Sequence, residues 1–114
     1  MNQTQTGRRA EQVAADFLVY KGCHMLDRNW RTRWCEIDIV ARRDGVVYFC
    51  EVKYRVTNKQ GSGVEYITDQ KLRQMRFAAG FWVAAHDWAG GMELCAIEVS
   101  GADFRITGVF KNVS

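Results

Sequence analysis

The sequence predicts an α/β domain in which two helices flank a mixed five-stranded sheet. Two stretches repeat apolar residues at the helical spacing, and shorter runs alternate apolar with polar residues as strands do. An Asp44-Gly45 turn joins two of these runs, which favours an antiparallel hairpin. The second of those strands, a long helix and another strand then follow in succession, which favours a crossover between parallel strands. The 114 residues suffice for one domain, residues 1–114.

The first half of the chain predicts one helix and three strands. A helix is expected over residues 8–21, where Ala10, Val13, Ala14 and Phe17 form an apolar stripe and Gly22 ends the pattern. Glu11 lies on the flank of this stripe, so it either leans over the packed surface or complements the helix dipole in the first turn. Strands are expected over residues 23–30, 34–42 and 46–55.

The second half predicts a loop, one long helix and two strands. Thr57 to Gly63 is polar and glycine-rich, as loops are. A helix follows within residues 64–87, capped either by Ser62 with Glu65 or by Thr68. Its buried stripe is expected to comprise Leu72, Met75, Ala79, Trp82 and Val83. Strands over 92–100 and 103–110, joined by Gly101-Ala102, complete the order α-β-β-β-α-β-β.

Charged residues inside the hairpin strands are the strongest functional signal. If Asp44 and Gly45 form a two-residue loop, Asp38 lies opposite Glu51, and Glu36 opposite Lys53. The Cβ atoms of such pairs are about 4.5–5.5 Å apart. Glu36 and Lys53 attract each other, whereas Asp38 and Glu51 repel each other unless a cation or a proton intervenes. A longer loop or a bulge would shift the register and move one strand's side chains to the other face.

The cysteines give no sign of a disulfide framework or a zinc site. Cys23, Cys35, Cys50 and Cys95 lack paired spacing. Residues 1–6 carry no signal-peptide pattern, and no apolar run is long enough to span a membrane, so a cytoplasmic protein with reduced thiols is expected. Cys35 and Cys50 are expected to be buried on the sheet face opposite the acids.

Positive charge is concentrated in the first two thirds of the chain. The net charge of +3 permits a polyanionic partner without requiring one. Trp30 and Trp34 flank Arg31 and Arg33, a pattern that either stacks on unpaired bases or marks the edge of the core.

With Glu11, Asp38 and Glu51-Val52-Lys53 identified, the chain resembles the PD-(D/E)xK nuclease superfamily, whose fold is restriction-endonuclease-like. More closely it resembles the YraN-like family of small uncharacterised bacterial proteins, often described as predicted endonucleases. The matching positions run through most of the chain: Gly7 to Glu11, Ala14-Ala15, Gly22, Asn29, Arg31, Glu36 to Ala41, Phe49, Glu51 to Arg55, Lys71 and Ala78-Ala79.

The resemblance implies a set of roles. Asp38, Glu51 and the backbone carbonyl of Val52 would bind Mg²⁺ or Mn²⁺, with Glu11 acting through water or on a second ion. Lys53 would orient the attacking water or stabilise the phosphate. The supporting residues would be Glu36, Gln70 and Lys71. The nucleic-acid contacts would come from Arg31, Arg33, Arg55, Lys59 and Lys71.

Three functions are compatible with the sequence. The leading one is a metal-dependent endonuclease, a hydrolase of phosphodiester bonds in DNA. Holliday-junction resolvases share the scaffold, which suggests branched or structured DNA as the substrate and allows a homodimer. The second is a non-catalytic nucleic-acid-binding module, favoured by Cys35 in place of the family's glycine and by Ala96. The third is a structural partner. No small-molecule cofactor and no membrane contact are expected.

Overall fold

The computed structural model describes residues 4–56 and 67–111 and confirms the predicted order of elements. The predicted 57–63 loop and the predicted contact Lys59 lie outside these residues. The elements are α1 (Gln5–Tyr20), β1 (His24–Arg31), β2 (Glu36–Arg43), β3 (Val46–Arg55), α2 (Asp69–Ala85), β4 (Gly91–Ser100) and β5 (Arg105–Lys111).

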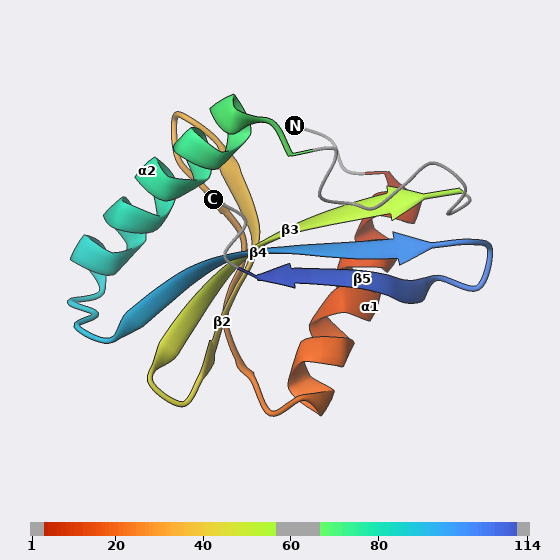
Figure 1. The fold of residues 1–114 in the computed structure, drawn as a ribbon, viewed down its shortest axis with the longest axis horizontal. Helices are drawn as coiled ribbons and strands as arrows, with labels where there is room; N and C mark the ends of the chain where they lie inside the picture. Colours follow the sequence, from red (N-terminus) through yellow and green to blue (C-terminus); the bar gives the residue numbers. More distant parts are fainter. Residues whose placement is uncertain (1–3, 57–66, 112–114) are drawn as a thin grey trace.

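The five strands form one mixed sheet in the order β1-β2-β3-β4-β5. β3 and β4 are parallel and are connected through α2, as predicted, while the other neighbours are antiparallel. Figure 1 shows the two helices on opposite sides of the sheet. Within the described residues, neither helix is long and apolar enough to cross a bilayer.

Each helix closes its own half of the core. The α1 side includes Ala14, Leu18, Ile39, Cys50 and Ile97. The α2 side includes Ile37, Phe49, Met75, Trp82 and Leu94. Because both faces of the sheet are covered, its central strands are almost continuously apolar, and the few charged side chains inside them are exceptional.

Side-chain caps fix where both helices begin. The Thr4 hydroxyl accepts a hydrogen bond from the Gly7 amide, so α1 begins three residues before the expected start at residue 8. The Thr68 hydroxyl accepts from the Lys71 amide, which settles the cap of α2 in favour of Thr68. This cap fixes the first turn of α2, from which Lys71 reaches toward the sheet.

The hairpin has the predicted register. Asp44 adopts a left-handed backbone with a φ of 54°, and the pairs run from Arg43 with Val46 to Ile39 with Cys50. The ladder between β2 and β3 ends at this last pair, whereas β3 continues to Arg55 alongside β4 (Figure 1). The two strands therefore separate just where the acidic residues begin.

Candidate active site

The separation of β2 and β3 places two buried carboxylates side by side. Asp38 and Glu51 are the first residues beyond the last ladder pair, and they are only 8% and 7% exposed. The Asp38 Oδ2 atom accepts a 2.7 Å hydrogen bond from the Val52 amide. This amide lies on the part of β3 that has no backbone ladder to β2, so the aspartate replaces a strand partner. The same bond holds the Asp38 carboxylate close to β3.

The surroundings of Asp38 disfavour its negative charge. The pKa of this carboxyl is raised to about 8, chiefly by burial and next by the charge of Glu51, while the hydrogen bond from Val52 acts in the opposite direction. Glu11 and Glu36 add smaller upward effects on the pKa. Three neighbouring acids thus repel a charge on Asp38, and a proton or a cation at this point relieves the repulsion.

Two lysines offset the charge of Glu51. The Nζ atom of Lys53 lies 3.5 Å from Glu51 Oε2, and the Nζ atom of Lys71 lies 3.7 Å from Glu51 Oε1. Lys53 comes from the same strand and Lys71 from the first turn of α2. Gln70, the neighbouring candidate, is exposed, and its side chain takes part in none of the side-chain hydrogen bonds found among the described residues. The structure therefore brings Lys71, but not Gln70, to the acids.

Glu11 joins the site from α1 through Asn29, a position that carries the family resemblance but to which the sequence assigned no role in the site. Its Oε1 atom accepts a 2.8 Å hydrogen bond from the side-chain amide of Asn29, and Glu11 itself is buried. Asn29 has a φ of 53°, a left-handed conformation that asparagine tolerates better than most residues. An asparagine inside a strand-like run is the signal that could have identified it.

One predicted ion pair is wrong. Glu36 was expected to pair with Lys53 across the hairpin, but its Oε2 atom lies 3.2 Å from Arg31 Nη2 on β1. Glu36 and Ile37 lie beyond the end of the β2–β3 ladder and are paired with Arg31 and Trp30 of β1 instead. This leaves Lys53 free of Glu36 and directed at Glu51.

Arg55 was predicted to contact nucleic acid, but the structure buries it inside the sheet instead of exposing it. Its side chain is 4% exposed, and its Nε atom lies 3.2 Å from Glu98 Oε2 in a buried ion pair. Arg31 and Arg33 are exposed, as a contact with a nucleic acid requires. The predicted contacts that remain in the described residues are therefore Arg31, Arg33 and Lys71.

Cys35 and Cys50 do not share a face, contrary to expectation. Cys50 is buried on the α1 side, while Cys35 is half-buried and packs on the α2 side with Ile37. Because Ile37 and Ile39 belong to opposite halves of the core, the strict alternation of β2 breaks at Asp38. Cys35 consequently lies near the acids. Burial raises the pKa of its thiol, and Lys71 and Glu51 are the charges that act on it most strongly.

The donor set fits a hard divalent cation in its chemistry. Carboxylate oxygens in a buried, mutually repelling group are the ligands that Mg²⁺ and Mn²⁺ prefer. In the described part of the chain, however, no three His, Cys, Asp or Glu side chains converge as metal ligands. Their oxygens are turned instead toward Val52, the two lysines and Asn29.

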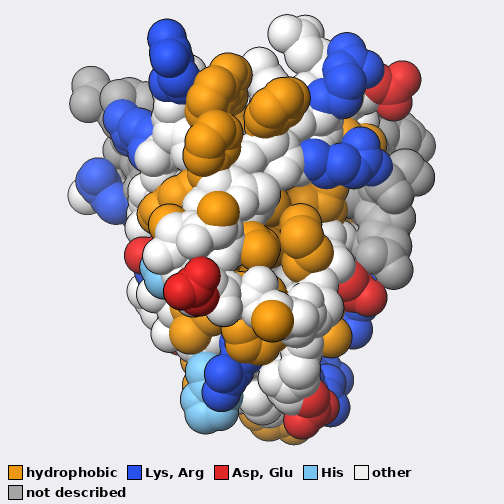
Figure 2. Space-filling view, turned by 90° about the vertical axis from the view of Figure 1, so that its left-hand side faces the viewer, with side chains coloured by type: hydrophobic (Ala, Val, Ile, Leu, Met, Phe, Trp, Pro, Cys, Tyr) orange, Lys and Arg blue, Asp and Glu red, His pale blue; other side chains and the backbone are white. Residues whose placement is uncertain are grey.

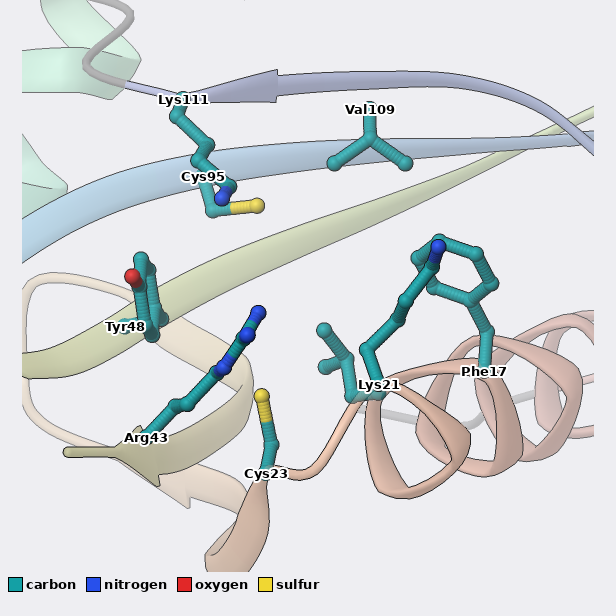
Figure 3. A pocket seen from close by; sticks show the side chains of 9 residues that line it. Phe17, Lys21, Cys23, Arg43, Tyr48, Cys95, Val109 and Lys111 are labelled. Atoms are coloured by element: carbon teal, nitrogen blue, oxygen red, sulfur yellow. The ribbon is translucent and has the colours of Figure 1, made fainter.

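A separate cavity of about 500 Å³ lies between α1 and the sheet. Figure 3 shows Lys21, Arg43 and Lys111 around it, together with the thiols of Cys23 and Cys95. None of the predicted site residues lines this cavity. It is therefore a feature of the α1 side, distinct from the acidic cluster.

Fold and site together define an α/β protein with a buried acidic cluster where two neighbouring strands separate. A family model described as "Uncharacterised protein family UPF0102" matches residues 10–106, and the chain belongs to this family. The matched range contains the acidic residues from Glu11 to Glu51 and both lysines, Lys53 and Lys71. This membership confirms the resemblance to the YraN-like family.

Relatives of the same name occur in several bacteria. A UPF0102 protein of Kineococcus radiotolerans is 45% identical over 80 residues, covering 70% of this chain and 66% of the relative, just under two thirds of its length. One of Mycolicibacterium gilvum is 41% identical over 93 residues, covering 76% of each chain. One of Mycobacterium tuberculosis is 37% identical over 93 residues, covering 78% of this chain and 73% of the relative.

Proposed function

We propose that this protein is a metal-dependent endonuclease that hydrolyses phosphodiester bonds in DNA. The observation that carries the proposal is the buried pair Asp38 and Glu51, in which burial and mutual repulsion raise the pKa of Asp38 to about 8. Burying two like charges side by side destabilises a fold. A binding site for a cation is the function that this arrangement serves best.

The acids of the cluster would bind the metal ion, and the neighbouring lysine would act on the water and the phosphate. Asp38 and Glu51 would hold Mg²⁺ or Mn²⁺, together with the Val52 carbonyl, and Glu11 would contribute through water. When bound, such an ion supplies a nucleophilic water at neutral pH and neutralises phosphate charge. Lys53, which is half-buried beside Glu51, positions the attacking water or stabilises the charge that develops on the phosphate.

Lys71 on α2 and Asn29 on β1 position the acids of this site. Lys71 approaches Glu51 from α2 and can turn to a phosphate when Glu51 binds a cation instead. Asn29 holds the Glu11 carboxylate by a hydrogen bond and so keeps it within the acidic cluster. Both residues are therefore positioning groups, and Lys71 is also a candidate contact to DNA.

A non-catalytic nucleic-acid-binding module is the second candidate. It is favoured by the partners that the acids already have, because Lys53 and Lys71 compensate Glu51 and Asn29 engages Glu11 without an ion. In this case the lysines would serve the stability of the fold and would bind phosphate without cleaving it.

A cleavage assay separates the two candidates. Linear, flapped and branched DNA is incubated with the full chain and Mg²⁺ or Mn²⁺. The wild type is expected to release product, and Asp38→Asn and Lys53→Met are each expected to slow cleavage at least about 100-fold, because both remove charge that acts at the reacting phosphate.

The matched control is Asp44→Asn, which removes an exposed acid from the turn of the same hairpin and keeps a residue that tolerates its left-handed backbone. Its rate should equal that of the wild type. Salt-sensitive DNA binding without product under either metal would support the non-catalytic module instead.

A further inference from the structure

Three stacked aromatic side chains are exposed beside the acidic cluster. The indole of Trp34 lies 4.8 Å from the ring of Phe81 at an interplanar angle of 12°, and 5.8 Å from Phe77 at 23°. These side chains are 42% (Trp34), 62% (Phe77) and 47% (Phe81) exposed. We call them the aromatic patch. Clustered apolar surface of this kind marks a binding site more often than scattered exposed residues do.

The patch is set among positive charges. The guanidinium carbon of Arg33 lies 5.6 Å from the Trp34 ring centroid. Between Gln70 and Ala85, α2 carries Lys71, Arg73 and Arg76 and no acidic residue. Figure 2, viewed from the α2 side, shows hydrophobic side chains gathered on this face with Lys and Arg side chains beside them. A ligand that combines flat apolar rings with negative charge complements this surface.

The patch and the acidic cluster are built on the same two segments. Trp34 stands four residues before Asp38, and the Sγ atom of its neighbour Cys35 donates a 3.4 Å hydrogen bond to the Gln74 carbonyl of α2. One turn away on α2, Lys71 reaches Glu51. A strand bound over the acids therefore has the patch within reach.

We propose that the aromatic patch binds unpaired nucleobases of the DNA strand whose phosphodiester lies at Asp38 and Glu51. The substrate class is then DNA with single-stranded nucleotides next to the cleaved bond, an inference that rests on the proposed nuclease function. Bases inside a duplex have both faces covered by their neighbours, whereas an unpaired base offers a free face to an aromatic ring. The surrounding arginines hold the phosphates of the same strand.

Binding without metal tests this proposal. The affinities for a fluorescent single strand of about 20 nucleotides and for a blunt duplex of the same sequence are measured by anisotropy in EDTA, at about 50 mM salt. Trp34→Ala is expected to weaken single-strand binding roughly 5- to 100-fold, because one stacked base is lost, and to leave duplex binding within about twofold.

Two variants make the result specific. Trp34→Phe keeps a ring and is expected to retain single-strand binding within about threefold. Tyr20→Ala removes an aromatic side chain that is 85% exposed on α1, away from the patch, and should have no effect. Arg73→Gln should weaken the binding of both DNA forms and reduce its salt dependence.

Three outcomes would overturn the proposal. Trp34→Ala could bind the single strand as tightly as the wild type does, or it could lose affinity for the single strand and the duplex equally. In the third, the wild type itself shows no single-strand binding. A wild-type dimer that Trp34→Ala converts to a monomer, with DNA binding unchanged, would assign the patch to a second copy of the chain. Single-strand binding through Trp34 without cleavage in Mn²⁺ would instead remove the nuclease proposal and leave the patch as a binding site.

Discussion

Replacing Asp38 by asparagine is expected to stabilise the protein at alkaline pH while removing its function. The asparagine carbonyl can still accept the hydrogen bond from the Val52 amide, whereas the repulsion from Glu51 disappears. The raised pKa, from 3.8 to about 8, sets an upper limit of about 5–6 kcal/mol for the cost of the charge. Since the carboxylate can shift toward water, we expect a gain on the order of 2 kcal/mol in the free energy of unfolding near pH 8.5.

The gain should depend on pH with a definite sign. Between about pH 4 and pH 8 the folded wild type keeps a proton on Asp38 that the unfolded chain has lost, so its stability falls relative to Asp38→Asn as the pH rises. Above this window the difference levels off. Urea unfolding in EDTA at about pH 5 and pH 8.5 measures the difference in the free energy of unfolding between Asp38→Asn and the wild type. Asp44→Asn is the control and should unfold as the wild type does at both pH values. A stability difference that is the same at both pH values contradicts this account of Asp38.

Removing Arg55 is expected to destabilise the fold strongly. Arg55→Ala leaves Glu98 buried without its cation, and breaking a buried ion pair in this way typically costs about 3–5 kcal/mol. Thr107 still donates a 2.8 Å hydrogen bond to Glu98 Oε1, but a neutral hydroxyl does not balance the carboxylate charge. The midpoint of urea unfolding should therefore fall well below that of the wild type.

Two controls show whether burial is the cause. The Nε atom of Arg105 lies 3.0 Å from Asp103 Oδ2 in an exposed ion pair, so Arg105→Ala should cost less than about 1 kcal/mol. The double variant Arg55→Met with Glu98→Gln removes both charges and keeps the bond from Thr107, so it should regain most of the lost stability. If Arg55→Ala keeps its stability but loses DNA binding, Arg55 is a surface contact after all.

The sequence determined the hairpin because its turn and its two strands are local. Asp44-Gly45 specifies the loop, and the apolar alternation on both sides fixes the register, which the structure confirms down to Ile39 with Cys50. For the cap of α2 the sequence left two alternatives, and the structure selects Thr68 over Ser62 with Glu65. The parallel pair β3 and β4 was predicted from the succession of strand, helix and strand along the chain. The hairpin prediction needed no knowledge of distant contacts.

What the sequence could not predict depends on where the strands separate. The pairing of Glu36 with Arg31 rather than Lys53 follows from the end of the β2–β3 ladder, which no single residue type signals. Arg55 is buried because Glu98 faces it from β4, a contact between segments far apart in sequence. The aromatic patch depends on a long-range contact as well, because the loop that carries Trp34 packs its ring against Phe77 and Phe81 of α2.

The binding of Mn²⁺ in the absence of DNA tests the central claim most directly. Electron paramagnetic resonance of the free ion, titrated with the full chain near neutral pH, counts the ions that the protein removes from solution. The wild type is expected to bind Mn²⁺, and Asp44→Asn should bind it equally, because that acid lies at the far end of the hairpin. Asp38→Asn and Glu51→Gln should each lose the site, since each removes a carboxylate ligand. A wild type that binds no Mn²⁺, or an Asp38→Asn variant that binds it as the wild type does, would contradict the account.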